Sequence, residues 1–295
     1  MKIGISSYSV RDATISGEMT LPGVIQWIAE QGGKHIEIVP FQNCGFTFSG
    51  PDDKLIAECK KTAAGCGVEI SGYTIGANFA TIGPDLRDIT TEERAAEVKR
   101  VKAQVDIAAA FGVKFMRHDA GSRQLEKCGI EQFDRDLPFV ADACREVADH
   151  AKQYGITTSV ENHGMLFQHS ERVRRLVAAV GRDNYRTTLD VGNFNNVDED
   201  SVIATLNVMP ITSFIHFKDF YIRKQVPVPE VWHKTMHGRF LRGAITGCGD
   251  VDLFSIAEII KKSGFNGFIS IEYEAAENYK YGIPIAIKNV KALFA

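Results

Sequence analysis

Hydrophobic residues recur along this chain with two alternating spacings. Short runs rich in β-branched and aromatic residues, several of them apolar at successive positions, are typical of parallel strands buried on both faces. Each run is followed by a stretch in which apolar residues return every three or four positions. In residues 21–32, for example, Leu21, Val24 and Ile28 line one side of a helix. The pattern predicts strands that alternate with amphipathic helices.

This alternation occurs eight times. The predicted strands are residues 2–10, 35–40, 68–76, 113–121, 157–164, 185–194, 212–220 and 265–274. The predicted helices are residues 21–32, about 53–65, a long helix from about 92, about 133–154, 170–181, 201–208, 252–264 and about 283–294. Eight units average about 37 residues each, as in a (β/α)8 TIM barrel. We therefore predict an α/β fold, a single TIM-barrel domain over residues 1–295.

A doubly wound open sheet is the alternative fold. It usually carries a glycine-rich phosphate turn after its first strand, whereas this chain has the segment SSYSVRD there. The chain also shows no linker, low-complexity tract or change of composition that would divide it. The barrel is therefore the preferred interpretation.

Composition narrows the class of protein. Hydrophobic residues make up 44% and charged residues 24%, and the net charge of −3 shows no basic excess of the kind that nucleic-acid binders carry. No apolar run approaches the roughly 18 residues of a membrane span. Six scattered cysteines without a CxxC pair suggest reduced thiols. We predict a cytoplasmic protein with neither nucleic acid nor membrane as a partner.

Candidate chemistry gathers where the last four strands end, which is the catalytic end of a TIM barrel. These strands carry Glu161, Asp190, His216 and Glu272 in turn. A single such residue is as easily explained by capping or packing. Four on successive strands favour a shared ion, because unpaired buried charge is costly. Carboxylates with one imidazole suit a divalent ion, Mn²⁺ first, with Mg²⁺, Co²⁺ or Zn²⁺ as alternatives.

The segments SVENHG, LDVGN, IHFKD and ISIEYE that carry these four residues resemble the metal-ligand motifs of the xylose isomerase-like TIM barrels. That superfamily includes ketose 3-epimerases, hydroxypyruvate isomerase, inosose dehydratase and many sugar phosphate isomerases and epimerases. The resemblance extends over nearly the whole chain and includes the glycine-rich segment GCGDVDL at 247–253. It implies a metal-dependent isomerase or epimerase of a small sugar, keto-sugar or polyol, and a homo-oligomer.

The resemblance also implies a mechanism. Glu161 and Glu272 lie on different strands, so one can remove a proton next to a substrate carbonyl while the other returns it. A bound ion would stabilise the enediolate as a Lewis acid. The candidate substrate-binding residues are His118, His163, Asn193, Lys218 and Arg223. Asn193 departs from the ketose 3-epimerases, which usually have histidine there, and Arg223 is the nearest counterpart of their strand-7 arginine.

Three other functions remain open on the same fold. Proton abstraction beside a ketone can also expel a leaving group, which would make the protein a lyase or dehydratase with His118 or His163 as the acid. An endonuclease IV-like enzyme is disfavoured, because the third strand ends in residues 73–76 without a histidine and the chain is acidic. A non-catalytic sugar-binding barrel is disfavoured by four intact candidate ligands.

Several further features have two interpretations. The stretch 221–250 is either a lid or a solvated basic loop or subunit contact, and His233 and His237 have the i, i+4 spacing of a helical metal pair. Glu37 either points into the barrel mouth or pairs with a lysine. The GCGD turn is compatible with a phosphate site after the last strands.

Overall fold

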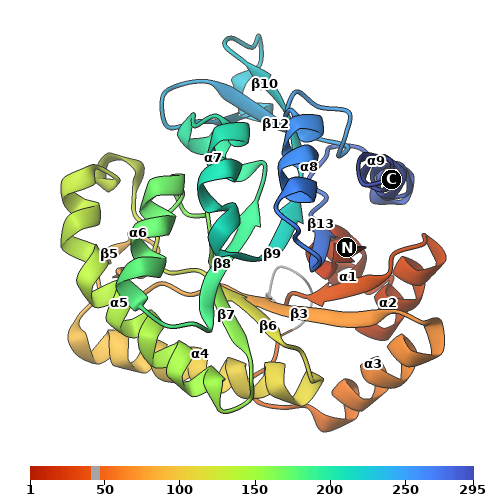
Figure 1. The fold of residues 1–295 in the computed structure, drawn as a ribbon, viewed down its shortest axis with the longest axis horizontal. Coiled ribbons are helices and arrows are strands. Elements are labelled where there is room, and N and C mark those ends of the chain that lie inside the picture. The colour runs from red at the N-terminus through yellow and green to blue at the C-terminus, as the bar shows by residue number, and fades with distance from the viewer. Residues whose placement is uncertain (41–46) are drawn as a thin grey trace.

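A closed parallel barrel organises the molecule in a computed structural model, which describes residues 1–40 and 47–295. The hydrogen-bonded order around the barrel is β1-β13-β9-β8-β7-β6-β3-β2 (Figure 1). The bounds of these strands are β1 (Lys2–Ser6), β2 (His35–Ile38), β3 (Glu69–Ile75), β6 (Phe115–His118), β7 (Thr157–Glu161), β8 (Tyr185–Asp190), β9 (Thr212–Phe217) and β13 (Phe268–Ile271). The predicted TIM barrel is confirmed.

Helices pack around the outside of the barrel (Figure 1). They are α1 (Arg11–Ile15), α2 (Leu21–Glu30), α3 (Asp53–Cys66), α4 (Thr91–Phe111), α5 (Ile130–Lys152), α6 (Ser170–Val180), α7 (Ser201–Val208), α8 (Leu253–Lys262) and α9 (Tyr279–Leu293). Local sequence sets their ends. Thr90 and Glu93 form a reciprocal capping box at the start of α4, and Gly112, with φ 82°, ends that helix in the left-handed region.

An aromatic layer closes the end of the barrel where the strands begin. Phe214 and Phe268 stack with their ring centroids 5.9 Å apart, and Phe115 packs against both rings. His35 completes this layer, with Nε2 2.9 Å from the Ile269 carbonyl oxygen. The predicted metal ligands Glu161, Asp190, His216 and Glu272 lie at the opposite end.

The stretch 221–250, predicted to be irregular, forms most of a second sheet. It is antiparallel in the order β10-β12-β11, with β10 (Asp219–Arg223), β11 (His233–Lys234) and β12 (Phe240–Ala244), and it stands beyond the barrel mouth (Figure 1). A smaller hairpin joins β4 (Thr81–Ile82) to β5 (Arg87–Asp88). Because His233 lies on a strand, the suggestion of a helical metal pair with His237 is wrong.

Asp198 attaches the second sheet to the barrel. Its carboxylate accepts hydrogen bonds from Thr235 Oγ1 at 2.9 Å, His237 N at 2.7 Å and Arg239 Nε at 2.5 Å. Gly243 of β12 lies so close to the segment after β13 that a Cβ there would stand 2.0 Å from the Glu274 carbonyl oxygen. This sheet therefore rests directly on the catalytic end.

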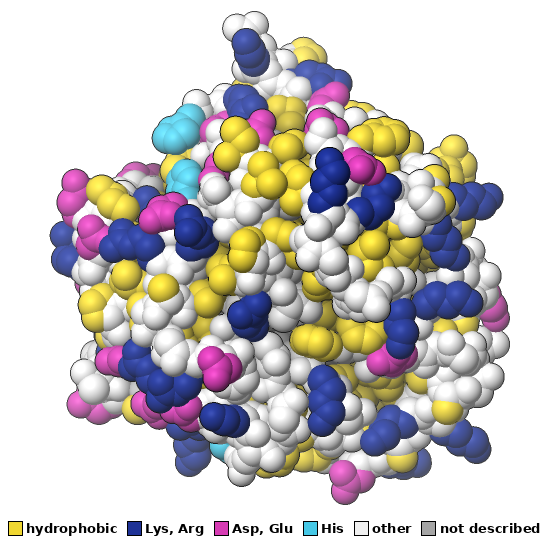
Figure 2. Space-filling model, in the orientation of Figure 1, with side chains coloured by type: hydrophobic (Ala, Val, Ile, Leu, Met, Phe, Trp, Pro, Cys, Tyr) yellow, Lys and Arg dark blue, Asp and Glu magenta, His cyan; other side chains and the backbone are white. Residues whose placement is uncertain are grey.

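The surface carries charges of both signs. On the face seen in Figure 2, Lys and Arg side chains are interspersed with Asp and Glu, and apolar side chains collect between α7 and α8. No helix in the described residues is long and apolar enough to cross a membrane. The cysteines that the structure describes are free, and Cys44 lies outside the described residues.

Candidate metal centre and active site

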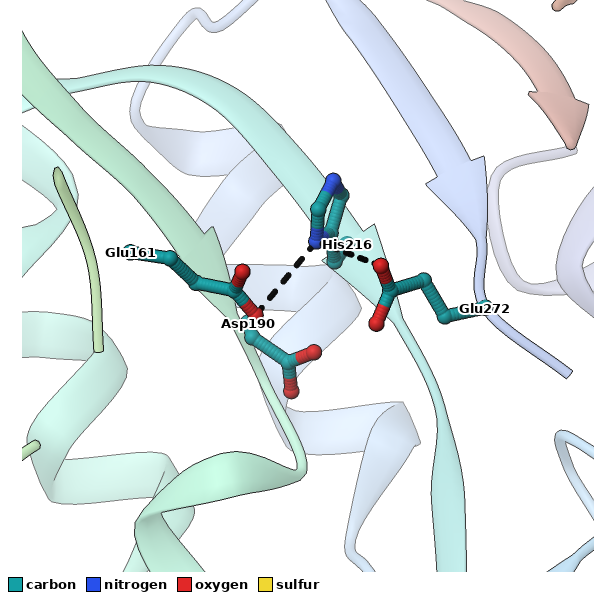
Figure 3. A group of neighbouring side chains, drawn as sticks. All are labelled: Glu161, Asp190, His216 and Glu272. Atoms are coloured by element: carbon teal, nitrogen blue, oxygen red, sulfur yellow. Dashed lines mark ion pairs between the residues drawn. The ribbon is translucent and has the colours of Figure 1, made fainter. Parts of the chain in front are cut away.

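Four buried side chains converge at the barrel mouth. Each of Glu161, Asp190, His216 and Glu272 offers a ligand atom, and these atoms all lie within 4.8 Å of one another (Figure 3). Glu161 and Asp190 end their strands, and Asp190 pairs in register with His216 on β9. The barrel therefore brings together side chains that are more than one hundred residues apart in the chain.

Two of these atoms are available for an ion. His216 Nδ1 lies 3.5 Å from Glu161 Oε1 and 3.3 Å from Glu272 Oε1, yet among the described residues it makes no hydrogen bond. Asp190 Oδ2 is likewise buried without a hydrogen bond to any described residue, although Lys218 Nζ forms an ion pair with it at 3.1 Å. Buried polar atoms are rarely left unpaired, and three carboxylates with one imidazole suit a divalent cation. The residues present therefore fit a metal.

The shifted pKa values of Asp190 and His216 also indicate that this site favours a cation. Burial and the carboxylates of Glu161 and Glu272 raise the pKa of Asp190 to about 7, although Lys218 opposes this shift. Burial disfavours the protonated form of His216, but the surrounding carboxylates outweigh it and raise its pKa well above the ordinary value. A bound divalent ion would relieve the repulsion among these carboxylates.

Glu37 holds the imidazole of His216, the candidate histidine ligand. Its Oε1 lies 3.0 Å from His216 Nε2 and also accepts a hydrogen bond from Thr74 Oγ1. When His216 Nε2 donates to this carboxylate, the lone pair of Nδ1 is directed at the candidate metal position. Glu37 thus points into the mouth, and the alternative of a lysine partner is wrong.

A family model for xylose isomerase-like TIM barrels matches residues 25–292. The chain belongs to this family. Inosose dehydratase from Lacticaseibacillus casei is 28% identical over 148 residues, which are 48% of each chain. Inosose isomerase from Halalkalibacterium halodurans is 26% identical over 152 residues, 50% of this chain and 49% of the relative. The chain thus aligns with about half the length of these curated relatives.

Solved structures share the fold of this xylose isomerase-like barrel at low identity. An L-ribulose 3-epimerase superposes with a TM-score of 0.73 at 16% identity, over 99% of this chain and 94% of the other. The probable 3-DHS dehydratase AsbF from Bacillus anthracis also gives 0.73, at 15% identity and 99% coverage of both chains. The IOLI protein, solved with a bound zinc atom, gives 0.68 at 18% identity, covering 99% and 96%.

Sequence reasoning missed a polar chain that supports Glu161. Arg117 Nη2 lies 2.5 Å from Glu161 Oε2 and 2.8 Å from Asp119 Oδ1. Asp119 in turn lies 3.0 Å from Nδ1 of His163, whose side chain is 52% exposed at the mouth. Asn193 Nδ2 donates to Glu161 Oε1 at 2.9 Å. Asn193 and His163, two of the predicted substrate-binding residues, therefore both lie at the site.

Two of the predicted substrate-binding residues lie elsewhere in this family member. His118 is fully buried between the barrel and its helices, against the rings of Phe79 and Tyr185. Arg223 lies on β10 with its side chain 47% exposed, 2.5 Å from Asp250 Oδ2. The structure therefore assigns neither residue to the mouth.

The GCGD turn is already occupied by a carboxylate of the chain. Asp219 accepts hydrogen bonds from the backbone N–H groups of Gly247, Gly249 and Val251 at 3.0, 2.7 and 3.2 Å. These amides are the donors that a phosphate would need after the last strands. The turn is therefore a structural clamp, and its predicted compatibility with phosphate is wrong.

Two adjacent chambers lie at the mouth. The inner chamber has a volume of about 210 Å³ and is lined by Tyr8, Val39, Thr74, Arg117, Asp119, Glu161, His163, Lys218, Glu272 and Glu274. The outer chamber has a volume of about 390 Å³ and is lined by His163, Gly164, Met165, Gln168, Asn193, Asn196, Lys218, Phe220, His233, Leu241, Gly243 and Glu274. They share His163, Lys218 and Glu274 as lining residues and are therefore adjacent.

Proposed function

We propose that this protein is a divalent-metal-dependent isomerase or epimerase of a small sugar, keto-sugar or polyol. The observation that carries this proposal is that Glu161 and Glu272 approach the candidate metal position from opposite sides (Figure 3). The names of similar proteins, among them an inosose isomerase and an L-ribulose 3-epimerase, support the same class of reaction.

The four residues Glu161, Asp190, His216 and Glu272 would hold the ion. A bound divalent ion would supply Lewis acidity toward the substrate oxygens. The carboxylate-rich ligand set favours Mn²⁺, with Mg²⁺, Co²⁺ and Zn²⁺ as alternatives. The zinc bound in the IOLI structure supports a divalent ion without selecting among these.

Each glutamate is held through one oxygen by a cationic side chain. Arg117 contacts Glu161 Oε2, and Lys218 Nζ lies 2.8 Å from Glu272 Oε2. Their Oε1 atoms face the shared centre instead, near His216 Nδ1. One carboxylate can therefore remove the proton beside the substrate carbonyl, while the other, in its protonated form, donates its own proton to the opposite face, which gives epimerisation. Return to the neighbouring carbon gives isomerisation.

A dehydratase is the second candidate function. His163 projects into both chambers and is held by Asp119, so it can deliver a proton to a departing hydroxyl. Similarity to inosose dehydratase favours this outcome too. His118, the other predicted acid, faces the helices and cannot fill the role. A cytoplasmic location, a homo-oligomeric state and the lack of a nucleic-acid partner remain predictions.

The test measures metal content and proton exchange together. Mass spectrometry should find about one divalent ion per chain, which the His216→Ala variant should lose. Exchange of substrate protons in D2O with a panel of ketoses should fall about 10²- to 10⁴-fold in Glu161→Gln and in Glu272→Gln. The exposed Glu258→Gln on α8 is the matched control.

The outcomes separate the candidates. Exchange without a new chromophore supports isomerisation or epimerisation, whereas an enone absorbance would identify the dehydratase. Near-normal exchange in both active-site variants would refute the two-glutamate mechanism. A protein that takes up no ion after loading with Mn²⁺ or Co²⁺ would refute metal dependence.

A further inference from the structure

The outer chamber is larger than the inner chamber, which contains Glu161 and Glu272. Small-molecule sites typically occupy about 300–1,000 Å³. The inner chamber, at about 210 Å³, lies below that range, and the outer chamber, at about 390 Å³, lies within it. A substrate that fills an ordinary site would therefore have to extend past Lys218 and His163 into the outer chamber.

Apolar side chains form one wall of the outer chamber. Phe220 comes from β10 and the fully buried Leu241 from β12, and Met165 of the turn after β7 lines the same chamber. The Met165 backbone is held at φ 62°, which non-glycine residues rarely adopt. Gln168 fixes this turn by accepting from Met165 N at 2.9 Å and donating to the Asn193 carbonyl oxygen at 2.6 Å. Hydrogen bonds therefore hold Met165 in its position beside the outer chamber.

The cations that line the two chambers are already paired among the described residues. Lys218 Nζ lies 3.1 Å from Asp190 Oδ2, 2.8 Å from Glu272 Oε2 and 3.5 Å from Glu274 Oε2. Arg117 is paired with two carboxylates in the inner chamber. The amides of the GCGD turn are taken by Asp219. Among the described lining residues, a phosphate would therefore find the exposed His233 as the basic side chain that no carboxylate pairs.

We propose that the substrate is an unphosphorylated glycoside of two rings. The ring that carries the carbonyl occupies the inner chamber, and a neutral second sugar ring lies in the outer chamber against Phe220 and Met165. The side-chain amide of Asn196 lines the same chamber and offers the second ring a hydrogen-bonding partner. This inference rests on the proposed function, because it places the reacting ring at the metal-site glutamates.

A matched series of substrates tests the inference. The manganese-loaded enzyme is given 3-keto-D-glucose, its 6-phosphate and 3-ketosucrose, and proton exchange beside the ketone is followed in D2O. The two-ring compound should exchange with a kcat/KM at least about tenfold above either single-ring compound, because remote binding energy is used in the transition state. Calorimetry on the same three compounds measures binding independently of turnover.

Variants locate the effect in the outer chamber. Met165→Trp fills the chamber and should reduce the preference for 3-ketosucrose toward one. Ile203→Trp, at an exposed position on α7 that lines neither chamber, should leave the preference unchanged. A preference that survives Met165→Trp in a folded protein would overturn the proposed position of the second ring.

Failure of the inference differs from failure of the proposed function. Equal or better exchange with 3-keto-D-glucose or its phosphate overturns the two-ring substrate and leaves the isomerase intact. If no keto-sugar exchanges although the ion is bound, the proposed function fails. Calorimetry then decides the inference: binding of 3-ketosucrose at least about tenfold tighter than of the single-ring compounds supports it, and equal or weaker binding overturns it.

Discussion

At the scale of single residues, Glu37 is the clearest example of a side chain that acts through another. It is fully buried and paired with His216, and removal from water raises its pKa, but the contacts with His216 and Thr74 outweigh this and lower it overall. Glu37 therefore remains a carboxylate that can accept the Nε2–H of the histidine ligand. Such outer partners typically fix the ring orientation and the basicity of a ligand.

We expect Glu37→Gln to weaken metal binding about 10- to 100-fold, because the neutral amide supports the His216 tautomer less well. Competition with a chelator, using Mn²⁺ on the purified protein, measures this affinity. Glu69→Gln, on the exposed start of β3, is the matched control. An unchanged affinity in Glu37→Gln would show that the pair serves packing alone.

The four candidate ligands could be predicted from sequence because chemistry-bearing residues at the ends of successive barrel strands must converge. The error at β6 came from choosing an imidazole over its neighbour. Side chains alternate across a strand, and Phe115 faces the interior aromatic layer, so Arg117 faces the interior as well and His118 faces the helices. This alternation was the available signal. Arg223 was misplaced because nothing in the sequence shows that its strand leaves the barrel.

At the scale of elements, the barrel strands and their helices followed the pattern, whereas the second sheet did not. Parallel strands are marked by continuous apolar runs, but β11 has only two residues and follows a proline-rich segment. The predicted first strand, 2–10, is in fact β1 followed by a 3₁₀ turn at Ser7–Val10, which brings Tyr8 to the inner chamber. Local propensity does not encode such turns at strand ends.

The second sheet depends on Asp198. Asp198→Asn keeps a residue that tolerates φ 58° but removes the charge that Arg239 contacts. We expect faster amide hydrogen exchange across residues 233–243, corresponding to about 1–2 kcal/mol less protection, because a charged hydrogen bond is weakened. Mass-resolved hydrogen exchange checks this, with the exposed Asp183→Asn as control. Unaltered protection would assign the attachment to β10–β12 pairing alone.

At the scale of the whole molecule, His35 in the aromatic layer makes the free energy of unfolding depend on pH. Burial lowers the pKa of His35 to about 4, whereas an imidazole in the unfolded chain titrates near pH 6.5. Between these values the unfolded chain binds the proton more readily, so this residue lowers the free energy of unfolding as the pH falls from about 6.5 to 4. Asp190 acts in the opposite direction, because its pKa is raised.

Because Asp190 opposes it, the contribution of His35 is measured by comparing the pH dependence of stability in the wild-type protein and in His35→Gln. We expect the urea midpoint of the wild-type protein to fall more between pH 7.5 and 5 than that of His35→Gln, which does not titrate there. The variant is less stable at pH 7.5, since it loses packing in the aromatic layer. Parallel pH profiles for both proteins would show that His35 does not stay neutral in the fold.

The backbone of Met165 has a consequence for improving heat resistance. A left-handed conformation favours glycine, so relief of this conformation in Met165→Gly would offset part of the apolar packing that the change removes. The same change would remove one wall of the outer chamber. Stability after heating is therefore a poor guard of this side chain, and a laboratory evolution campaign that screens only for residual fold would leave the proposed substrate preference unselected.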